Sequence, residues 1–147
     1  MDDLNASEAE LLGIVLVTHG NFGQALIEAA ETVLGPQEKC LAVGVDVTQG
    51  VDATMETIRS ALLSVQSECG ALALTDLFGG SPTTMSLSLM KSENIEVITG
   101  VNLPMLVAAL QARCQPIDEA AQKAKEAGRQ GIKVAGAMLR KGKKRRS

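Results

Sequence analysis

The sequence predicts an α/β fold in which helices cover both faces of a parallel β-sheet. Four short apolar runs alternate with segments whose apolar residues recur at helical spacing. Continuous apolar runs are typical of strands buried on both faces, and their alternation with helices is typical of parallel sheets. Hydrophobic residues make up 46% of the 147-residue chain and charged residues 21%, which is enough to bury a core without disulfide or metal support.

The first half of the chain predicts two strands and two helices. The run Gly-Ile-Val-Leu-Val predicts a buried strand, and the apolar period then changes to that of a helix ended by Gly35 and Pro36. A second strand and a second amphipathic helix follow. The expected strands cover residues 13–17 and 40–45. One expected helix covers residues 22–34, and the other begins at residue 51 and ends near Gly70.

The second half repeats this alternation. Strands are expected at residues 71–74 and 95–99, and helices at residues 82–90 and from about residues 104 and 116 onward. Each of these helices has a proline in its expected first turn, where proline is favoured. Residues from Ile132 to Leu139 predict a weaker strand interrupted by glycine, which pairs either at a sheet edge or with another subunit.

Small doubly wound sheets commonly have the flavodoxin-like strand order 2-1-3-4, so we expect that order here. No linker or repeat divides the chain, which predicts one domain over residues 1–147 with a core at residues 12–139.

The net charge is −3, but six of the 14 basic residues lie in residues 140–147. We expect this tail to be disordered; docking to an acidic partner, nucleic acid or membrane is the alternative.

Composition excludes several other classes of protein. The three scattered cysteines indicate reduced thiols, and the acidic N-terminus is unlike a secretory signal. The apolar runs are too short to span a membrane, which predicts a cytoplasmic protein. With two Phe and no Tyr or Trp, the chain lacks aromatic platforms for nucleic acid bases, so no nucleic acid partner is expected.

The candidate site follows from the strand order. Ligands of such sheets bind beyond the carboxyl ends of the strands, where the order reverses. Strands 1 and 3 are expected to be neighbours there, and they are followed by His19, the single histidine, and by Asp76. We therefore expect these side chains to meet. The alternatives are structural roles: His19 would lie in a loop, and Asp76 would cap a turn.

Several kinds of chemistry at this pair are disfavoured. A Ser–His–Asp hydrolase would need Ser81 as nucleophile, but a serine before a proline is an ordinary helix start, and no G-x-S-x-G elbow is present. One histidine without clustered cysteines leaves too few ligands for zinc, so no metal is expected. The glycine-rich fingerprints of nucleotide sites are also absent.

Phosphorylation of the imidazole fits better. A carboxylate that accepts a proton from one ring nitrogen fixes the tautomer and leaves the other nitrogen free to attack. It also stabilises the positive charge that grows on the ring. The turn Gly79-Gly80-Ser81-Pro82 offers backbone N–H groups, a hydroxyl and a helix N-terminus, which together suit phosphoryl oxygens.

Three motifs resemble the enzyme IIA domain of the mannose-type phosphotransferase system (PTS). They are Gly-Ile-Val-Leu-Val-Thr-His-Gly at residues 13–20, Leu-Thr-Asp-Leu-Phe-Gly-Gly-Ser-Pro at residues 74–82 and Gly-Val-Asn-Leu-Pro-Met-Leu at residues 100–106. The resemblance runs from about Leu12 to Leu139. It implies a homodimer that swaps its last, antiparallel strand, which would place residues 132–139.

The resemblance also implies a function. His19 would take a phosphoryl group from phospho-HPr, on the nitrogen not bonded to Asp76, and pass it to a IIB component during sugar uptake. The chain would then be a protein-histidine phosphotransferase without cofactor, in contact with the membrane only through a transporter. Thr18, Gly79, Gly80 and Ser81 would surround the phosphoryl group, and Asn102 and Pro104 would line the site.

Two other functions stay open. One is a regulatory PTS phosphoprotein that acts on a binding partner without a permease. The other, ranked lower, is the phosphotransfer subunit of dihydroxyacetone kinase, which shares the fold.

Overall fold

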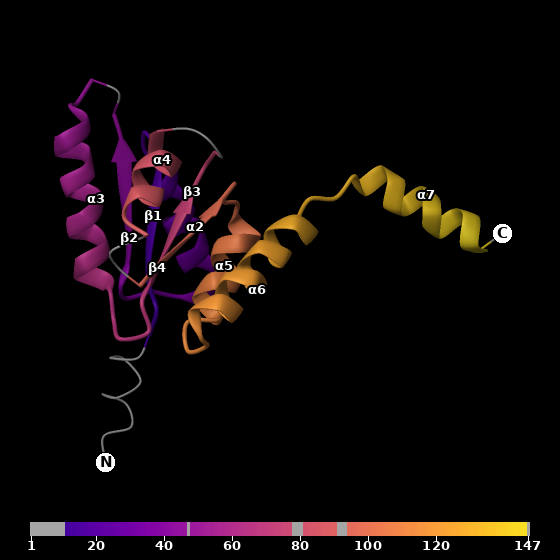
Figure 1. Cartoon of the computed structure of the whole chain (residues 1–147). Helices are drawn as coiled ribbons and strands as arrows, with labels where there is room; N and C mark the ends of the chain where they lie inside the picture. The colour runs from indigo at the N-terminus through magenta and orange to yellow at the C-terminus, as the bar shows by residue number, and fades with distance from the viewer. Residues whose placement is uncertain (1–10, 47, 78–80, 91–93, 147) are drawn as a thin grey trace, which may run out of the picture.

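The structure is a computed structural model that describes residues 11–46, 48–77, 81–90 and 94–146 of the chain. Four parallel strands form one sheet in the order β2-β1-β3-β4, which confirms the predicted order. The strands are β1 (Gly13–His19), β2 (Cys40–Val45), β3 (Ala71–Thr75) and β4 (Ile95–Thr99). The sheet forms a middle layer between two layers of helices (Figure 1).

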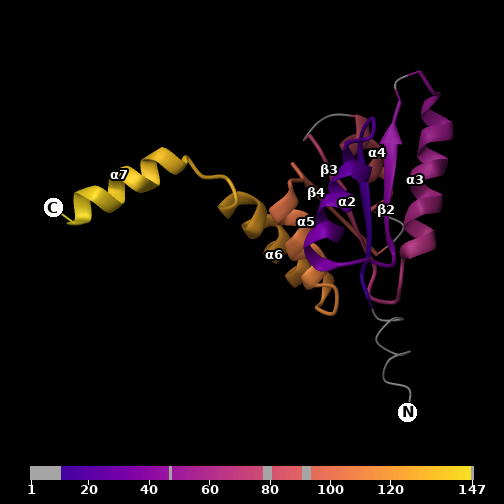
Figure 2. The same cartoon turned by 180° about the vertical axis from the view of Figure 1, so that it is seen from behind.

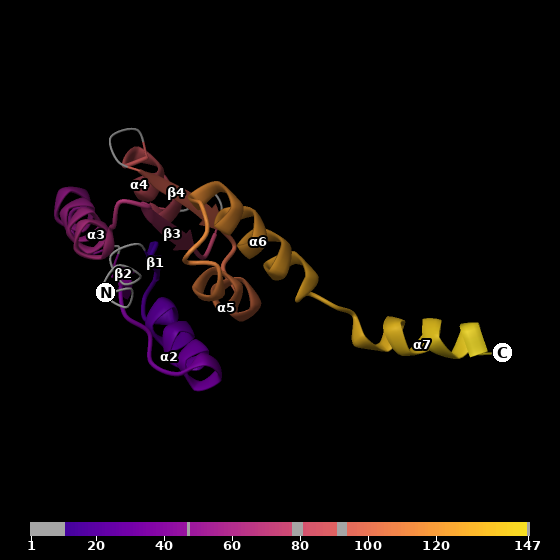
Figure 3. The same ribbon diagram turned by 90° about the horizontal axis from the view of Figure 1, so that it is seen from below.

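The helices described in the structure are α2 (Phe22–Leu34), α3 (Val51–Val65), α4 (Ser81–Ser88), α5 (Leu103–Gln111), α6 (Ile117–Gln130) and α7 (Ala135–Arg146). Helices α2, α5 and α6 cover one face of the sheet, and α3 and α4 cover the other (Figures 2 and 3). Among the described residues, no helix has both the length and the apolar character needed to cross a bilayer.

Strand β1 lies in the centre of the core. Its successive side chains enter opposite faces of the sheet: Ile14 and Leu16 pack among α2, α5 and α6, whereas Val15 and Val17 pack toward α3 and α4. All four side chains are fully buried. A continuous apolar run is therefore required here, and His19, at the carboxyl edge, is held by a strand whose other residues are all buried.

Element boundaries agree with the sequence in most places. The expected ranges 22–34, 40–45 and 95–99 are each found as predicted, whereas the helix that begins at Val51 ends at Val65, before the expected end near Gly70. Strand β1 is longer than expected because pairing with β2 continues through His19, opposite Val45. Helix α4 ends at Ser88, two residues before the expected end, and the turn that follows carries the backbone hydrogen bond from the N–H of Met90 to the carbonyl of Leu87.

The C-terminal segment differs from both expectations. In this single chain the strand expected at residues 132–139 is not formed, and Ala135–Arg146 forms helix α7; pairing of this segment with a second subunit stays a prediction. Residues 140–146, where the sequence predicts a disordered tail, belong to α7 in the structure, and residue 147 lies outside the described residues. A strand needs a hydrogen-bonded neighbour, whereas alanine, methionine, leucine, lysine and arginine form helices locally.

Candidate functional site

The site lies at the carboxyl edge of the sheet, where β1 and β3 end side by side. Val17 and Thr75 are register partners in these two strands. The next residues along each strand turn over the edge and bring His19 and Asp76 together, although they are 57 positions apart in sequence. The structure therefore brings together the two residues that the strand order predicted to meet.

One carboxylate oxygen holds the histidine at two points. Oδ2 of Asp76 lies 2.8 Å from Nδ1 of the His19 ring and accepts the His19 backbone N–H at 2.9 Å. The His19 side chain is 44% exposed, whereas that of Asp76 is 12% exposed. Both the main chain and the ring of His19 are thus fixed, while part of the ring stays open to solvent.

The hydrogen bonds from His19 also determine the charge of Asp76. Burial raises the pKa of Asp76, but the hydrogen bonds from the His19 backbone and ring outweigh it and hold the pKa below its usual value of 3.8. Asp76 is therefore a carboxylate at neutral pH, and it accepts the proton on Nδ1. Because Nδ1 is engaged in this way, Nε2 is the ring nitrogen that keeps a free lone pair.

A hollow of about 470 Å³ opens beside the histidine, and it is lined by His19, Gly20, Asn21, Gly44, Val45 and Asp46. Asp46 contributes a second negative charge. Its carboxylate accepts hydrogen bonds from the backbone N–H and the hydroxyl of Thr48, and these lower the pKa of Asp46. The hollow can therefore admit a side chain of a partner protein next to the ring and the Asp46 carboxylate.

Thr18 does not have the expected role. The family resemblance implied that Thr18 lies beside the phosphoryl group, but the residue is fully buried in the structure. Its Oγ1 accepts the backbone N–H of Gly23 at 2.9 Å and lies 3.4 Å from the His19 carbonyl, to which it donates. Asn21, before α2, makes no side-chain cap, so Thr18 supplies the hydrogen bond that a cap normally makes. Through these two hydrogen bonds, Thr18 connects the turn at His19 to the start of α2.

Gly44 was missed by the sequence analysis. It lies opposite Thr18 in β2, and a Cβ atom placed on it would collide with the backbone carbonyl of Gly20. Gly20 itself has a positive φ of 53° and donates its N–H to the carbonyl of Val45. The turn after His19 therefore rests directly on β2, and this close approach requires a glycine at position 44.

We expect Gly44→Ala to displace the Gly20 carbonyl and, with it, His19. The free energy of unfolding should fall by about 1–3 kcal/mol, as overpacking typically costs, and any reaction at His19 should slow by about tenfold. Urea unfolding and the rate of His19 modification measure these effects. Gly50→Ala is the matched control, because a Cβ there meets open space. Equal effects of both substitutions would contradict a specific role for Gly44.

A buried threonine pair supports the second half of the site. The Thr83 hydroxyl donates to the carbonyl of Leu77, and it accepts a hydrogen bond from the Thr75 hydroxyl at 2.6 Å. Both threonines are almost fully buried, so β3, the residue after Asp76 and helix α4 are tied together. Ser81 begins α4 and is exposed, whereas Gly79 and Gly80 lie outside the described residues.

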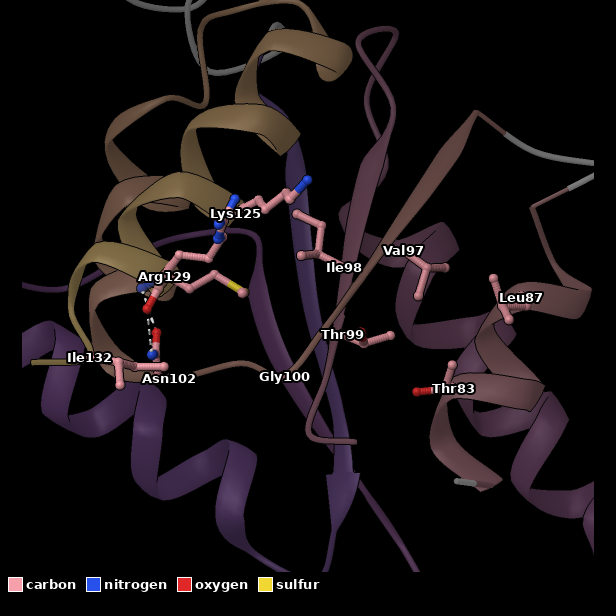
Figure 4. A pocket seen from close by; sticks show the side chains of 12 residues that line it. Thr83, Leu87, Val97, Ile98, Thr99, Gly100, Asn102, Lys125, Arg129 and Ile132 are labelled. Carbon is pink, nitrogen blue, oxygen red and sulfur yellow. Dashed lines mark hydrogen bonds between the residues drawn. The ribbon is translucent and has the colours of Figure 1, made fainter. Parts of the chain in front are cut away.

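Asn102 and Pro104 lie elsewhere than expected. The Asn102 side chain accepts the backbone N–H of Met105 and donates to the carbonyl of Gly128, so it caps α5 and joins it to α6. Pro104 lies in the first turn of α5, near Gly131. Neither residue lines the hollow beside His19. Asn102 lines a different cavity, along β4, where Figure 4 shows its hydrogen bond.

The arrangement offers the chemistry of a nucleophilic imidazole. Within the described part of the chain, no group of three or more His, Cys, Asp or Glu side chains could hold a metal ion. His19 and Asp76 instead pair with each other, with Nε2 as the available atom.

Comparison with known proteins agrees with this geometry. The family model EIIA-man, described as PTS system fructose IIA component, matches residues 13–126. The chain is 36% identical over 126 residues to the PTS system mannose-specific EIIAB component of Escherichia coli (strain K12), an alignment that covers 84% of this chain and 39% of that protein. It is 29% identical to the PTS system fructose-specific EIIA component of Bacillus subtilis (strain 168), with 70% of this chain and 71% of that protein covered.

Solved structures show the same architecture. The crystal structure of phosphotransferase system component EIIA from Streptococcus agalactiae superposes with a TM-score of 0.78 at 25% identity, and the match covers 86% of this chain and 99% of that one. The resemblance carried by the three sequence motifs is thereby confirmed. The family match spans the whole of the described sheet and both residues of the His19–Asp76 pair, and the chain belongs to the EIIA-man family of PTS IIA components.

Proposed function

We propose that the protein is a phosphoryl carrier of a sugar phosphotransferase system, with His19 as the residue that is phosphorylated. The observation that supports this most is the 2.8 Å contact between Nδ1 of His19 and Oδ2 of Asp76, in a ring that is still 44% exposed. An exposed ring can meet a phosphorylated partner protein, and a held tautomer keeps its nucleophilic nitrogen available. Membership of the EIIA-man family supports the same activity.

In the proposed reaction, the lone pair on Nε2 of His19 attacks the phosphorus carried by phospho-HPr. A new N–P bond forms while the N–P bond of the donor breaks, and the bonding pair leaves with the donor nitrogen. The His19 ring gains positive charge as Nε2 is phosphorylated and keeps its proton on Nδ1. Asp76, a carboxylate at neutral pH, stabilises that charge through the hydrogen bond it already makes.

The phosphoryl oxygens need donors of their own. We assign these to the start of α4, where Ser81 offers a hydroxyl and the helix N-terminus offers backbone N–H groups. Gly79 and Gly80 are proposed to contribute from the preceding residues. The Thr75–Thr83–Leu77 hydrogen bonds support this role, because they fix α4 relative to the end of β3 and hence to Asp76.

Phosphorylation in vitro tests the proposal. The protein is incubated with phosphoenolpyruvate, enzyme I and HPr, and intact mass and peptide mapping are measured without acid, because phosphohistidine is acid-labile. We expect one phosphoryl group per chain, located on His19 and absent when HPr is omitted. Phosphate on another residue, or none at all, would contradict the proposal.

We propose a IIB component as the next acceptor. The chain spans 39% of the length of the Escherichia coli relative, whose name joins EIIA and B in one component. Loss of the phosphate from loaded protein on addition of a IIB component would support this step.

We also propose that two copies of the chain form a dimer through residues 132–139. Strand β4 is at the edge of the sheet, and a cavity of about 470 Å³ follows it between α4 and α6 (Figure 4). Its lining includes Thr83, Leu87, Val97, Met105 and Ile132. Ile132 and Val134 are 74% and 71% exposed in the single chain, and pairing of this segment with β4 of a second copy would bury them.

The mass in solution tests the dimer. Light scattering should give twice the mass of one chain for the wild type. Ile132→Asp combined with Val134→Asp should give a monomer, because two buried carboxylates oppose pairing but cost the exposed single chain little. Lys133→Asp, on the intervening residue, is the control that should remain dimeric. A monomeric wild type, or a dimeric double variant, would contradict this arrangement.

A further inference from the structure

A second cavity continues the cavity along β4 toward the amino edge of the sheet. It has a volume of about 340 Å³, and Glu96 and Asp118 line it. The two cavities share three lining residues, which Figure 4 shows side by side: Val97, Ile98 and Lys125. Together they form one groove between β4 and α6, which leads from Gly100 at the carboxyl edge to Glu96 at the amino edge; we call it the β4 groove.

The amino end of the β4 groove carries two carboxylates. Glu96 lies on the same face of β4 as Ile98, which packs among α2, α5 and α6, so its side chain is on the α6 side of the sheet. Asp118 is in the first turn of α6. Among the described residues, neither carboxylate takes part in an ion pair, although Lys125 lines the same cavity. Both negative charges are therefore available to a cation from outside the chain.

A basic segment follows directly after the residues proposed to pair with β4. All 17 acidic residues of the chain lie at or before Glu126, whereas six of the basic residues lie between Arg140 and Arg146. Arg140 and Lys141 are the first of these six, and both are exposed in the single chain. The segment at residues 132–139 thus ends in a charge opposite to that of Glu96 and Asp118.

The path of the chain leads this basic segment to the acidic end of the groove. Helix α6 ends at the carboxyl edge, where the Asn102 side chain donates to the carbonyl of Gly128 and Ile132 lines the groove. A segment that follows β4 from this point runs toward the amino edge, and in a symmetric exchange it takes the same path on the second copy.

The length and the side-chain alternation of the segment fit this path. Eight extended residues span about 26 Å and the five residues of β4 about 16 Å, so residues 132–139 are long enough to cross between copies and reach the end of the groove. Residues eight positions apart in an extended segment face the same side. Arg140 is therefore on the α6 side, as Ile132 is, which is also the side of Glu96.

We propose that Arg140 and Lys141 of one copy bind Glu96 and Asp118 at the amino end of the β4 groove of the second copy. This contact rests on the dimer proposed above and extends it, because the paired segment then ends in an ionic contact that fixes its direction and register. In the dimer, residues 135–139 leave helix α7 and become extended. The contact lies at the rim of the groove, so salt weakens it.

Charge reversal on either side of the contact tests the proposal. The variant Arg140→Glu with Lys141→Glu, and the variant Glu96→Lys with Asp118→Lys, each place like charges together in their own dimers. We expect the dissociation constant of each dimer to rise by at least about tenfold at about 0.1 M salt. When the two variants are mixed, every reversed segment meets a reversed groove and every wild-type segment meets a wild-type groove. Native mass spectrometry should then show mainly the mixed dimer. Mixing in statistical proportions, or an unchanged dissociation constant, would overturn the proposal.

A control with the same change of charge locates the effect. Asp52→Lys with Glu56→Lys reverses two charges on α3, and Asp52 is in the first turn of its helix as Asp118 is. This control should form dimers as the wild type does, and it should not prefer the variant with Arg140→Glu and Lys141→Glu. Equal results for the α3 control and the groove variant would show general charge repulsion and overturn a role for the groove.

A milder pair of substitutions keeps the test valid if charge reversal disturbs folding. Glu96→Gln with Asp118→Asn removes both charges but keeps the shape of the groove. It should weaken the dimer severalfold at low salt and make its dissociation constant less dependent on salt. The salt dependence of the wild type in this variant would contradict the contact.

The outcomes separate this contact from the functions proposed above. A monomeric wild type would overturn the dimer and the contact together, whereas a dimeric wild type with statistical mixing of the variants would overturn the contact alone. Phosphorylation of His19 by phospho-HPr should proceed in all these variants, because none of the substituted residues lines the hollow beside His19.

Discussion

The His19→Ala variant is expected to accept no phosphoryl group from phospho-HPr, with a loss of rate of at least about a thousandfold. The chain contains a single histidine, so no second imidazole can replace the lost nucleophile. The side chain is 44% exposed and at the rim of the sheet, so its removal creates little cavity and should leave the fold intact. The fall in rate would then report lost chemistry.

Intact mass measured without acid gives the phosphorylated fraction directly. Thermal unfolding of His19→Ala should stay close to that of the wild type, which serves as the control for folding. His19→Gln is a second control, because it keeps a polar side chain of similar length but has no nucleophilic ring nitrogen. Phosphate in either variant at the wild-type rate would assign the carrier role to another residue.

The second large effect is expected from Asp76→Ala. The substitution removes the acceptor of both the ring proton and the backbone N–H of His19, so the ring is free to rotate and to change tautomer. We expect transfer to slow by about a hundredfold while His19 stays modifiable. The transfer rate of Asp76→Asn should lie between those of the wild type and Asp76→Ala. Its amide oxygen can still accept one hydrogen bond, but it carries no charge to stabilise the phosphorylated ring.

The pH dependence of stability provides an independent measurement on Asp76. Because the folded-state pKa of Asp76 lies below its usual value of 3.8, its hydrogen bonds favour folding above that pH and lose their contribution as pH falls through the folded-state pKa. Urea unfolding of the wild type and Asp76→Asn should therefore differ most near neutral pH and converge below about pH 4. A difference that stays constant down to acid pH, or wild-type transfer kinetics in Asp76→Ala, would remove the carboxylate from the mechanism.

Much of this architecture could be predicted from the sequence because its signals are local and repeated. The apolar run of β1 and the helical spacing between Phe22 and Leu34 each specify one type of element. Once the strands alternate with helices, the handedness of the connections leaves few possible orders, and the order 2-1-3-4 brings the residues after β1 and β3 together. The meeting of His19 and Asp76 thus follows from topology without any contact being known.

The contacts that the sequence did not reveal depend on distances between elements. The requirement for glycine at position 44 comes from the carbonyl of Gly20, which reaches β2 only once the turn has folded. The Thr18 hydroxyl could equally have pointed outward, and packing decides that it supports α2. At residues 132–139 the same sequence is compatible with a strand or a helix, and the presence or absence of a neighbouring strand decides between them.

Thr83 borders two parts of the molecule at once. Its hydroxyl holds the carbonyl of Leu77, the residue after Asp76, while the residue also forms part of the wall of the cavity along β4. Thr83 therefore contacts both the residue after Asp76 and the cavity along the β4 edge of the sheet. A shift of α4 imposed from the β4 side would be transmitted through a rigid, buried hydroxyl to the neighbour of Asp76, so the proposed subunit contact and the proposed chemistry share a mechanical connection.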